Sequence, residues 1–327
     1  MYNPVPLAEA GYLYAQLNWP GEVNSNHSFP MIVAFSGGWQ TNPEIERRNW
    51  QADGLKTHFM AEILRALDTD QNVIFSGEDI SDIPVEGLRA FSDLAREKGF
   101  AVRPIMFVRP PLEFITSMSQ TRIRHGDPFH IFEGQKSANI DACLQVWPDM
   151  TCIVFQKAAR HPKGPCGMLV DAFGLSSPDR YEVVSANNSM SDFSTRIIGH
   201  INRQIPLYLD GAVNPLRHYL DTEPLAQIAG PKFILTQSEF MSIREFLQEE
   251  NAAIAGLLGP EFCDRTFNFN VTPDPWGAQA LGELAEAMQP LRPEMQDCIR
   301  GYFSLSPDVS PTDRTLAREI LREGPKR

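Results

Sequence analysis

Two residue types that bind phosphate stand eight positions apart in the segment FVRPPLEFITSMSQTRIRHG. Arg109 ends a short apolar run, VRPIMFVR (102–109), and Ser117 lies within the helix-like run LEFITSMSQTRIRHG (112–126). A guanidinium supplies a planar fork of charged donors, and a hydroxyl adds a neutral donor. Placed this way, the two side chains can converge on one phosphate. The alternative is the more ordinary role of a strand-terminal arginine, a salt bridge or a solvated end.

A carboxylate and an imidazole are further candidates for chemistry. Glu78 ends the short apolar run NVIFSGE (72–78), and a carboxylate there could take the proton from an attacking hydroxyl. The alternative is that Glu78 caps or orients the turn after it, because Asp79 and Ser81 are residue types that begin helices. His27 could face a bound acceptor, or it could be a hydrogen-bonded structural residue, the more common role of a lone histidine.

The elements that must position these side chains alternate between strand and helix. Short apolar runs rich in β-branched residues indicate strands, and apolar residues three and four apart indicate helices. The expected strands span 72–78, 102–109 and 151–156, and the expected helices around them span 55–67, 85–99, 112–126 and 140–148. This order predicts parallel strands joined by right-handed crossovers, hence an α/β protein with a doubly wound parallel sheet. Ligands of such sheets bind at the carboxyl ends of the strands, where Glu78 and Arg109 both fall.

The second half of the chain is mostly helical. Residues 192–205 and 241–259 have helical apolar spacing, and the tail from about residue 275 is helical with a proline-rich break at 304–311. We therefore expect an α/β domain over 1–270 and a mostly helical C-terminal extension over 271–327 that packs on the same domain.

Composition limits the classes of function. Of 327 residues, 43% are hydrophobic and 21% are charged, which describes a globular protein able to bury a core. The formal net charge of −12 argues against a nucleic-acid partner, although a local site can still bind a small anion. No apolar run approaches the ~20 residues of a membrane helix, and the first residues do not resemble a secretory signal. Five scattered cysteines have neither zinc spacing nor an even count, so we expect reduced thiols, no metal and a cytoplasmic location.

Together with its neighbours, the segment of Arg109 and Ser117 resembles the 3′-phosphate-binding element of the P-loop sulfotransferases. In that family an arginine at a strand end is followed by a serine eight residues later. NVIFSGEDIS is similar to the strand that carries an "SSE" motif in bacterial carbohydrate-type members. Further similarities, in family order, cover roughly residues 5–265: NHS (26–28), RHG after the helix, LQVWPDMTCIVFQ, NNSMS (187–191) and FLQEENAAIAGLLG.

The resemblance implies a fold, a reaction and roles for four residues. The fold would be a doubly wound sheet of the P-loop nucleoside triphosphate hydrolase and sulfotransferase type. The chain would transfer a sulfuryl group from 3′-phosphoadenosine 5′-phosphosulfate, its co-substrate, to a hydroxyl of a carbohydrate or small-molecule acceptor, without a metal. Arg109 and Ser117 would bind the 3′-phosphate of the donor, Glu78 would be the catalytic base, and His27 would face the acceptor.

One departure from the family pattern concerns the phosphosulfate-binding loop. Complete members carry a loop like PKTGTT after their first strand, and this sequence contains none. Gly134-Gln-Lys136-Ser137 lacks the adjacent Gly-Lys pair, and Met31–Gly38 reads as strand and glycine turn but has no lysine after it; the family comparison makes that run helical. LAEAGYLY (7–14) resembles the segment after the first helix, so we expect one βα unit, on the order of 20–30 residues, to be missing.

The missing loop leaves two alternatives open. A catalytically inactive relative would bind a glycan, a nucleotide or a protein instead of transferring a group. A kinase-like transferase is less favoured, because no Walker motif or Mg²⁺-binding acid is recognisable.

Overall fold

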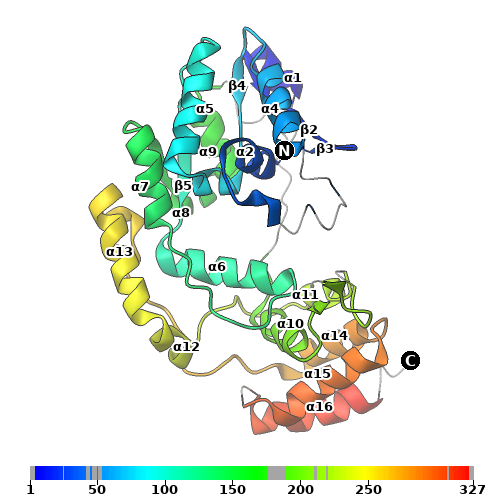
Figure 1. Cartoon of the computed structure of the whole chain (residues 1–327). Coiled ribbons are helices and arrows are strands. Elements are labelled where there is room, and N and C mark those ends of the chain that lie inside the picture. Colours follow the sequence, from blue (N-terminus) through cyan, green and yellow to red (C-terminus); the bar gives the residue numbers. More distant parts are fainter. Residues whose placement is uncertain are drawn as a thin grey trace. The chain divides into compact units, whose positions relative to one another are not determined.

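The computed structural model describes residues 4–24, 26–41, 45, 50, 54–175, 189–209, 212–218, 220–307 and 309–323 (Figure 1). The chain is a mixed α/β protein, mostly helical, with small two-stranded sheets. It divides into two compact units. The first unit comprises Met1–Arg109, Gln135–Ser185 and Ala253–Phe262, and the second unit comprises Pro110–Gly134, Ala186–Ala252 and Cys263–Arg327.

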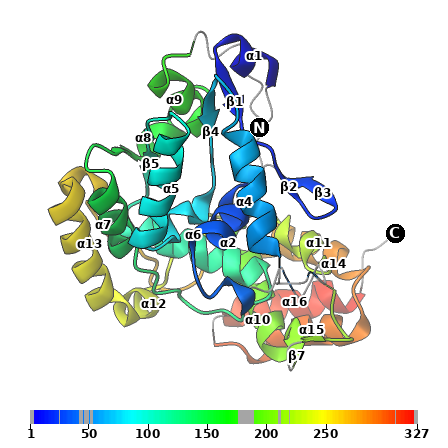
Figure 2. The same ribbon diagram turned by 45° about the horizontal axis from the view of Figure 1, so that its top comes forward.

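The first unit contains two pairs of parallel strands. Strand β1 (Tyr12–Tyr14) pairs with β4 (Asn72–Ile74), and β5 (Ile105–Val108) pairs with β6 (Thr151–Val154) (Figure 2). The strands expected at 72–78, 102–109 and 151–156 are therefore confirmed, each shorter than its apolar run. The coarse α/β class and the parallel pairing agree with expectation. The described strands of this unit form separate parallel pairs and one short hairpin, β2 (Leu17–Trp19) with β3 (Glu22–Asn24).

The helices expected in the first unit are present. Helix α5 (Val85–Glu97) buries Leu88, Phe91 and Ala95 along one face and ends before Gly99, whose φ of 86° is the left-handed conformation of a helix stop. The run Met31–Phe35 is helical, as the family resemblance implied; it lies within α2 (Ser28–Phe35), which is buried on most sides. The helices of this unit are α1 (Pro4–Glu9), α2 (Ser28–Phe35), α4 (Leu55–Ala66), α5 (Val85–Glu97), α7 (Ser137–Val146), α8 (Phe155–Ala159) and α9 (Gly164–Ala172).

The second unit is built around α10 (Asp192–Gln204), which is buried on nearly all sides. Ser191 caps this helix by accepting a hydrogen bond from the Ser194 N–H at 3.1 Å. Its core joins Ile197, Ile198 and Ile201 to apolar residues of the C-terminal helices. The other elements are α6 (Pro111–Arg124), β7 (Tyr208–Leu209), β8 (Ala212–Val213), α11 (Glu223–Ala226), α12 (Gln237–Ser242), α14 (Gly277–Met288), α15 (Pro293–Leu305) and α16 (Pro311–Glu323).

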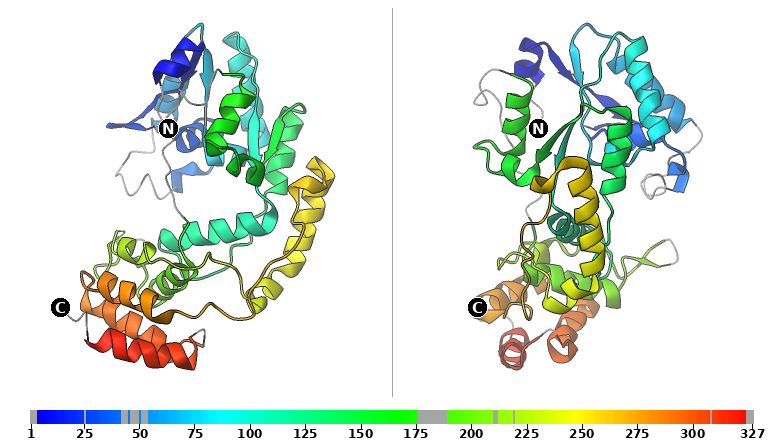
Figure 3. Two further views of the ribbon diagram at one scale, coloured as in Figure 1. Left: turned by 180° about the vertical axis from the view of Figure 1, so that it is seen from behind. Right: turned by 90° about the vertical axis from the view of Figure 1, so that its left-hand side faces the viewer.

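The C-terminal helices follow the expected pattern. Helix α16 contacts both α14 and α15 within the second unit (Figure 3), and the break between α15 and α16 falls inside the expected range 304–311. The helix expected at 241–259 is interrupted at Ile243, between α12 and α13 (Arg244–Leu258). The domain boundary expected at residue 270 stays a prediction.

The amino end of α6 is capped by a residue distant in sequence. The Leu112 N–H donates to Asp264 Oδ2 at 3.0 Å across 152 positions. Asn251 fixes this carboxylate: its Nδ2 donates to Asp264 Oδ2 at 3.0 Å, and its Oδ1 accepts from the Asp264 N–H at 2.7 Å. The first turn of α6 therefore depends on a tertiary hydrogen bond.

Candidate functional site

Arg109 and Phe155 stand side by side at the carboxyl ends of two paired strands. The last residues of β5 and β6, Val108 and Val154, are paired in the parallel register, so the residues after them emerge at the same edge. The guanidinium carbon of Arg109 lies 4.1 Å from the centroid of the Phe155 ring. Stacking on an aromatic face fixes the plane of a guanidinium, whose N–H donors lie in that plane. The strand ends thus carry a positioned cation of the kind that binds phosphate.

Ser117, the predicted partner of Arg109, lies in the middle of α6. It is half-buried, and its carbonyl accepts a hydrogen bond from the Thr121 hydroxyl at 3.1 Å. Arg109 belongs to the first unit and Ser117 to the second. Their joint binding of one phosphate stays a prediction.

Glu78 is exposed and follows the carboxyl end of β4, where it begins the short 3-10 helix η2 (Glu78–Asp82). The preceding Gly77 packs directly on the start of α2: a Cβ at this position would lie 2.5 Å from Ser28 N and 2.7 Å from Ser28 Oγ. Ser28 Oγ also accepts a hydrogen bond from the Asp79 N–H at 3.1 Å. The turn that carries Glu78 is therefore fixed against α2. This placement fits both roles considered for Glu78, and its action as a base stays a prediction.

The acidic side chains after Glu78 are partly neutralised. Lys136 Nζ donates to Asp82 Oδ1 at 3.0 Å, and Asn139 Nδ2 donates to the same oxygen at 2.6 Å. Among the residues that the structure describes, no group of three or more His, Cys, Asp and Glu side chains could hold a metal ion.

His27 is fully buried, and both of its ring nitrogens form hydrogen bonds. The Ser76 N–H donates to Nδ1 at 2.8 Å, so the ring proton resides on Nε2 and is donated to the Ala15 carbonyl at 2.7 Å. Burial lowers the pKa of His27, although the hydrogen bond to Ala15 opposes this effect in part. The ring lies between Tyr14 and Phe75, at centroid distances of 4.8 and 5.8 Å. These contacts match the structural alternative for His27; the acceptor-site role stays a prediction.

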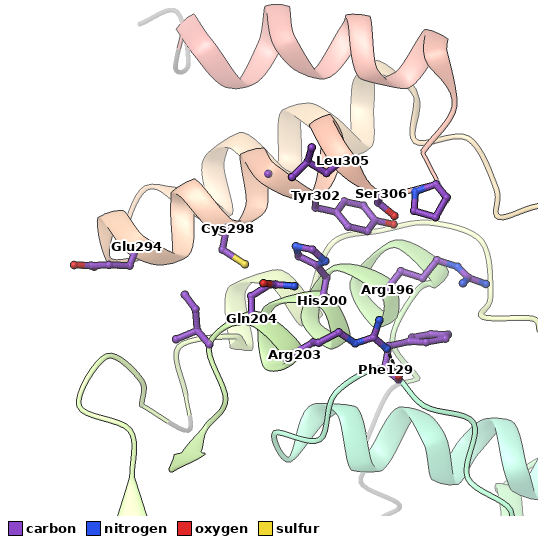
Figure 4. A pocket seen from close by; sticks show the side chains of 13 residues that line it. Phe129, Arg196, His200, Arg203, Gln204, Glu294, Cys298, Tyr302, Leu305 and Ser306 are labelled. Carbon is purple, nitrogen blue, oxygen red and sulfur yellow. Dashed lines mark hydrogen bonds between the residues drawn. The ribbon is translucent and has the colours of Figure 1, made fainter.

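A cavity in the second unit was not expected from the sequence. It lies between α10 and α15 and has a volume of about 570 Å³ (Figure 4). Helix α10 contributes Arg196, His200 and Arg203, which recur at positions i, i+4 and i+7 and so share one face of the helix. This recurrence of basic and imidazole side chains along an amphipathic helix was the available sequence signal.

The two arginines of the cavity wall differ in how their charge is balanced. Arg196 Nε donates to both oxygens of Asp192 at 3.0 Å, and its Nη1 donates to Glu239 Oε1 at 2.8 Å. Burial alone would raise the pKa of Glu239, but the hydrogen bonds and charge of Arg196 outweigh it and lower that pKa. Arg203 Nη2 donates to the Phe129 carbonyl at 2.7 Å, and no ion pair of Arg203 occurs within the described ranges.

Two further lining groups are uncharged at neutral pH. Burial and then the charge of Arg203 lower the pKa of His200, which keeps the imidazole neutral. Burial raises the pKa of the Cys298 thiol to about 11, so it stays protonated and is a poor nucleophile. Neither His200 nor Cys298 is therefore an activated nucleophile, and the cavity is better suited to binding a ligand than to nucleophilic catalysis at these two side chains.

No family model, curated protein or solved structure matches this chain. Three features are therefore described by their own geometry alone: Arg109 over Phe155 at paired strand ends, Glu78 on its fixed turn, and the cavity beside Arg203. In the described part of the chain, no helix is both long and apolar enough to cross a membrane.

Proposed function

We propose that this chain is a sulfotransferase-like protein that binds 3′-phosphoadenosine 5′-phosphosulfate and transfers its sulfuryl group to a hydroxyl of a carbohydrate or small molecule. The observation that carries the proposal is Arg109, stacked on Phe155 at the carboxyl ends of β5 and β6. Ligands of parallel α/β sheets bind at this edge, and a guanidinium placed over an aromatic ring can donate to a pair of phosphate oxygens. We also propose that the two parallel strand pairs belong to one doubly wound sheet of the P-loop type.

In the proposed reaction, the acceptor oxygen forms a bond to sulfur while the bond from sulfur to the 5′-phosphate oxygen breaks. The proton of the acceptor hydroxyl passes to the Glu78 carboxylate, and 3′-phosphoadenosine 5′-phosphate leaves. Arg109 binds the 3′-phosphate, with the Ser117 hydroxyl as a second hydrogen-bond donor. The nucleotide is thereby held at a point remote from the bond that breaks. Most of the rate gain would come from positioning and electrostatic stabilisation, as in phosphoryl transfer.

The absence of a PKTGTT-like loop favours a second candidate, an inactive relative that binds the nucleotide without transferring sulfate. That loop supplies the backbone donors and the lysine that stabilise charge on the transferred group. The two candidates share the Arg109 site and differ in turnover, so binding and transfer must be measured separately.

The decisive experiment is a calorimetric titration with 3′-phosphoadenosine 5′-phosphate, comparing the parent chain with Arg109→Ala and Arg109→Lys. We expect micromolar binding that Arg109→Ala weakens by about 1.5–3 kcal/mol, the size of a hydrogen bond to a charged group. Arg103→Ala is the matched control, because Arg103 is an exposed arginine shortly before β5 and distant from its carboxyl end. Equal affinity of Arg109→Ala and the parent, or no binding at millimolar nucleotide by the folded chain, would overturn the proposal.

Transfer is then tested with radiolabelled phosphosulfate and a panel of sugars and small hydroxyl compounds. Transfer by the parent that is lost in Glu78→Gln supports the enzyme. Nucleotide binding without transfer to any acceptor supports the inactive relative.

A further inference from the structure

The cavity between α10 and α15 has the size and walls of a small-molecule site. Its volume of about 570 Å³ lies within the ~300–1,000 Å³ that ligand pockets occupy. Phe129, Tyr302 and Leu305 supply apolar surface to the wall. Leu305 is 81% exposed, so a ligand seated there would remove a large apolar side chain from water.

The charge along the cavity is asymmetric. Arg203 stands beside Phe129, to whose carbonyl it donates a hydrogen bond, and both lie on the side of the cavity away from Glu294 (Figure 4). Arg203 makes no ion pair with any described residue, whereas the charge of Arg196 is balanced by Asp192 and Glu239. A fixed cation beside apolar surface favours an anionic group at the Arg203 end.

Gly301 leaves room for a ligand in the wall formed by α15. This glycine lies inside the helix, where it stabilises less than alanine by roughly 0.5–1 kcal/mol, and a Cβ added there would meet no atom within 4 Å. Packing against protein atoms therefore does not require glycine at this position. Because Gly301 lines the cavity, a larger side chain there would project into space that a ligand would use.

We propose that this cavity binds an organic carboxylate with an aromatic or aliphatic body, its carboxylate accepting hydrogen bonds from Arg203 and its body packing on Phe129, Tyr302 and Leu305. The neutral imidazole of His200 and the amide of Gln204 also line the cavity and offer further polar groups to a ligand (Figure 4). All of these residues belong to the second unit. The inference does not depend on the proposed nucleotide site, which has its own variants and its own probe.

The probes are 2-naphthoate and its neutral isostere 2-naphthamide, titrated into the full chain by calorimetry. We expect 2-naphthoate to bind at least tenfold more tightly than the amide, because only the carboxylate pairs with the guanidinium. Arg203→Gln should abolish this preference and leave the amide affinity within about twofold, while Arg203→Lys should retain part of it.

The location of the binding site is tested with one variant that fills the cavity and one control variant. Gly301→Leu should abolish binding of both probes, and its thermal unfolding temperature should not fall, because leucine favours a helix. Gly282→Leu is the matched control: Gly282 is also a helix glycine with no atom within 4 Å of an added Cβ, and it does not line the cavity. Equal affinities for acid and amide, no binding at millimolar 2-naphthoate, or parent-like binding by folded Gly301→Leu would overturn the inference.

Discussion

His27 and Ser76 are joined by two hydrogen bonds, one through the ring and one through the main chain. The Ser76 N–H donates to His27 Nδ1 at 2.8 Å, and the His27 N–H donates to the Ser76 carbonyl at 3.2 Å. The last hydrogen bond of the ladder between β1 and β4 is donated by the Ala15 N–H to the Ile74 carbonyl at 3.0 Å. Beyond it, the His27 imidazole bridges the two segments by bonding to the Ala15 carbonyl and the Ser76 N–H. A side chain thus extends the strand pairing up to the turn that carries Glu78.

Replacing His27 with alanine should destabilise the chain strongly. The Ala15 carbonyl would lose its partner in a buried position and the Ser76 N–H would lose its partner in a partly buried one, at up to about 1–3 kcal/mol each. We therefore expect a loss of about 2–5 kcal/mol in the free energy of unfolding, measured by urea denaturation. His125→Ala, a change at an exposed histidine, should stay within about 0.5 kcal/mol. Equal stabilities of the two variants would contradict the structural role of His27.

The buried imidazole should also make stability depend on pH. Because burial lowers the pKa of His27 below 6.5 in the folded state, the unfolded chain takes up its proton first as the pH falls. Stability is therefore fully present above pH ~6.5 and is lost as the pH drops from there toward the lower folded pKa.

His27→Gln isolates this effect, since glutamine keeps a donor and an acceptor but does not titrate. Unfolding free energies measured between pH 7.5 and 5.5 should fall less steeply in the variant than in the parent. The contribution of His200, whose pKa is also lowered, is common to both proteins and cancels. Parallel pH profiles would show that His27 does not titrate differently on folding.

Gly77→Ala should disturb the turn before Glu78. The added methyl group would meet Ser28 N at 2.5 Å, which is backbone and cannot rotate away. Overpacking of this kind costs about 1–3 kcal/mol, measurable by thermal or urea unfolding. The φ of Gly77 is −167°, so the cost comes from the contact and not from the backbone conformation. Gly37→Ala, where no atom lies within 4 Å of the added Cβ, should be nearly neutral; an equal cost at both positions would contradict this explanation.

Arg196→Met should be among the most destabilising changes in the second unit. It would leave the buried carboxylate of Asp192 without its counter-charge, and breaking such a pair from one side costs about 3–5 kcal/mol. Arg300→Met removes an exposed pair with Asp297 and should cost less than about 1 kcal/mol. Urea denaturation of both variants measures the difference. A cost for Arg196→Met no larger than that for Arg300→Met would show that the buried pair adds nothing to stability.

Much of the local structure follows from apolar spacing, and the failures have physical causes. Helix α5 was predictable because one apolar face and a glycine stop agree. The run Met31–Phe35 was ambiguous: five successive apolar residues suit a buried strand or a helix buried on most sides, and periodicity cannot separate the two.

Residues that depend on tertiary contacts were harder to assign. The hydrogen-bond partners of the His27 ring, Ala15 and Ser76, lie 12 and 49 positions away in the sequence. No spacing in the sequence predicts these two contacts. Likewise, Arg196 forms an ion pair with Glu239, 43 positions away, whereas Arg203 donates to the Phe129 carbonyl. This difference between the two arginines depends on the folded structure and cannot be read from the sequence. The position of Arg109 directly after β5 was predictable from the end of its apolar run, whereas β4 ends at Ile74 and Glu78 lies four residues later, in η2.

The Asp264 cap on α6 has a consequence for the order of events during synthesis. The helix emerges from the ribosome long before its cap does, since 152 positions separate Leu112 from Asp264. Until then, the amino end of α6 lacks the acceptor that completes its first turn. Helix α6 therefore reaches its final hydrogen bonding only after most of the chain has been translated. The helix bearing Ser117 is therefore a late-maturing part of the protein.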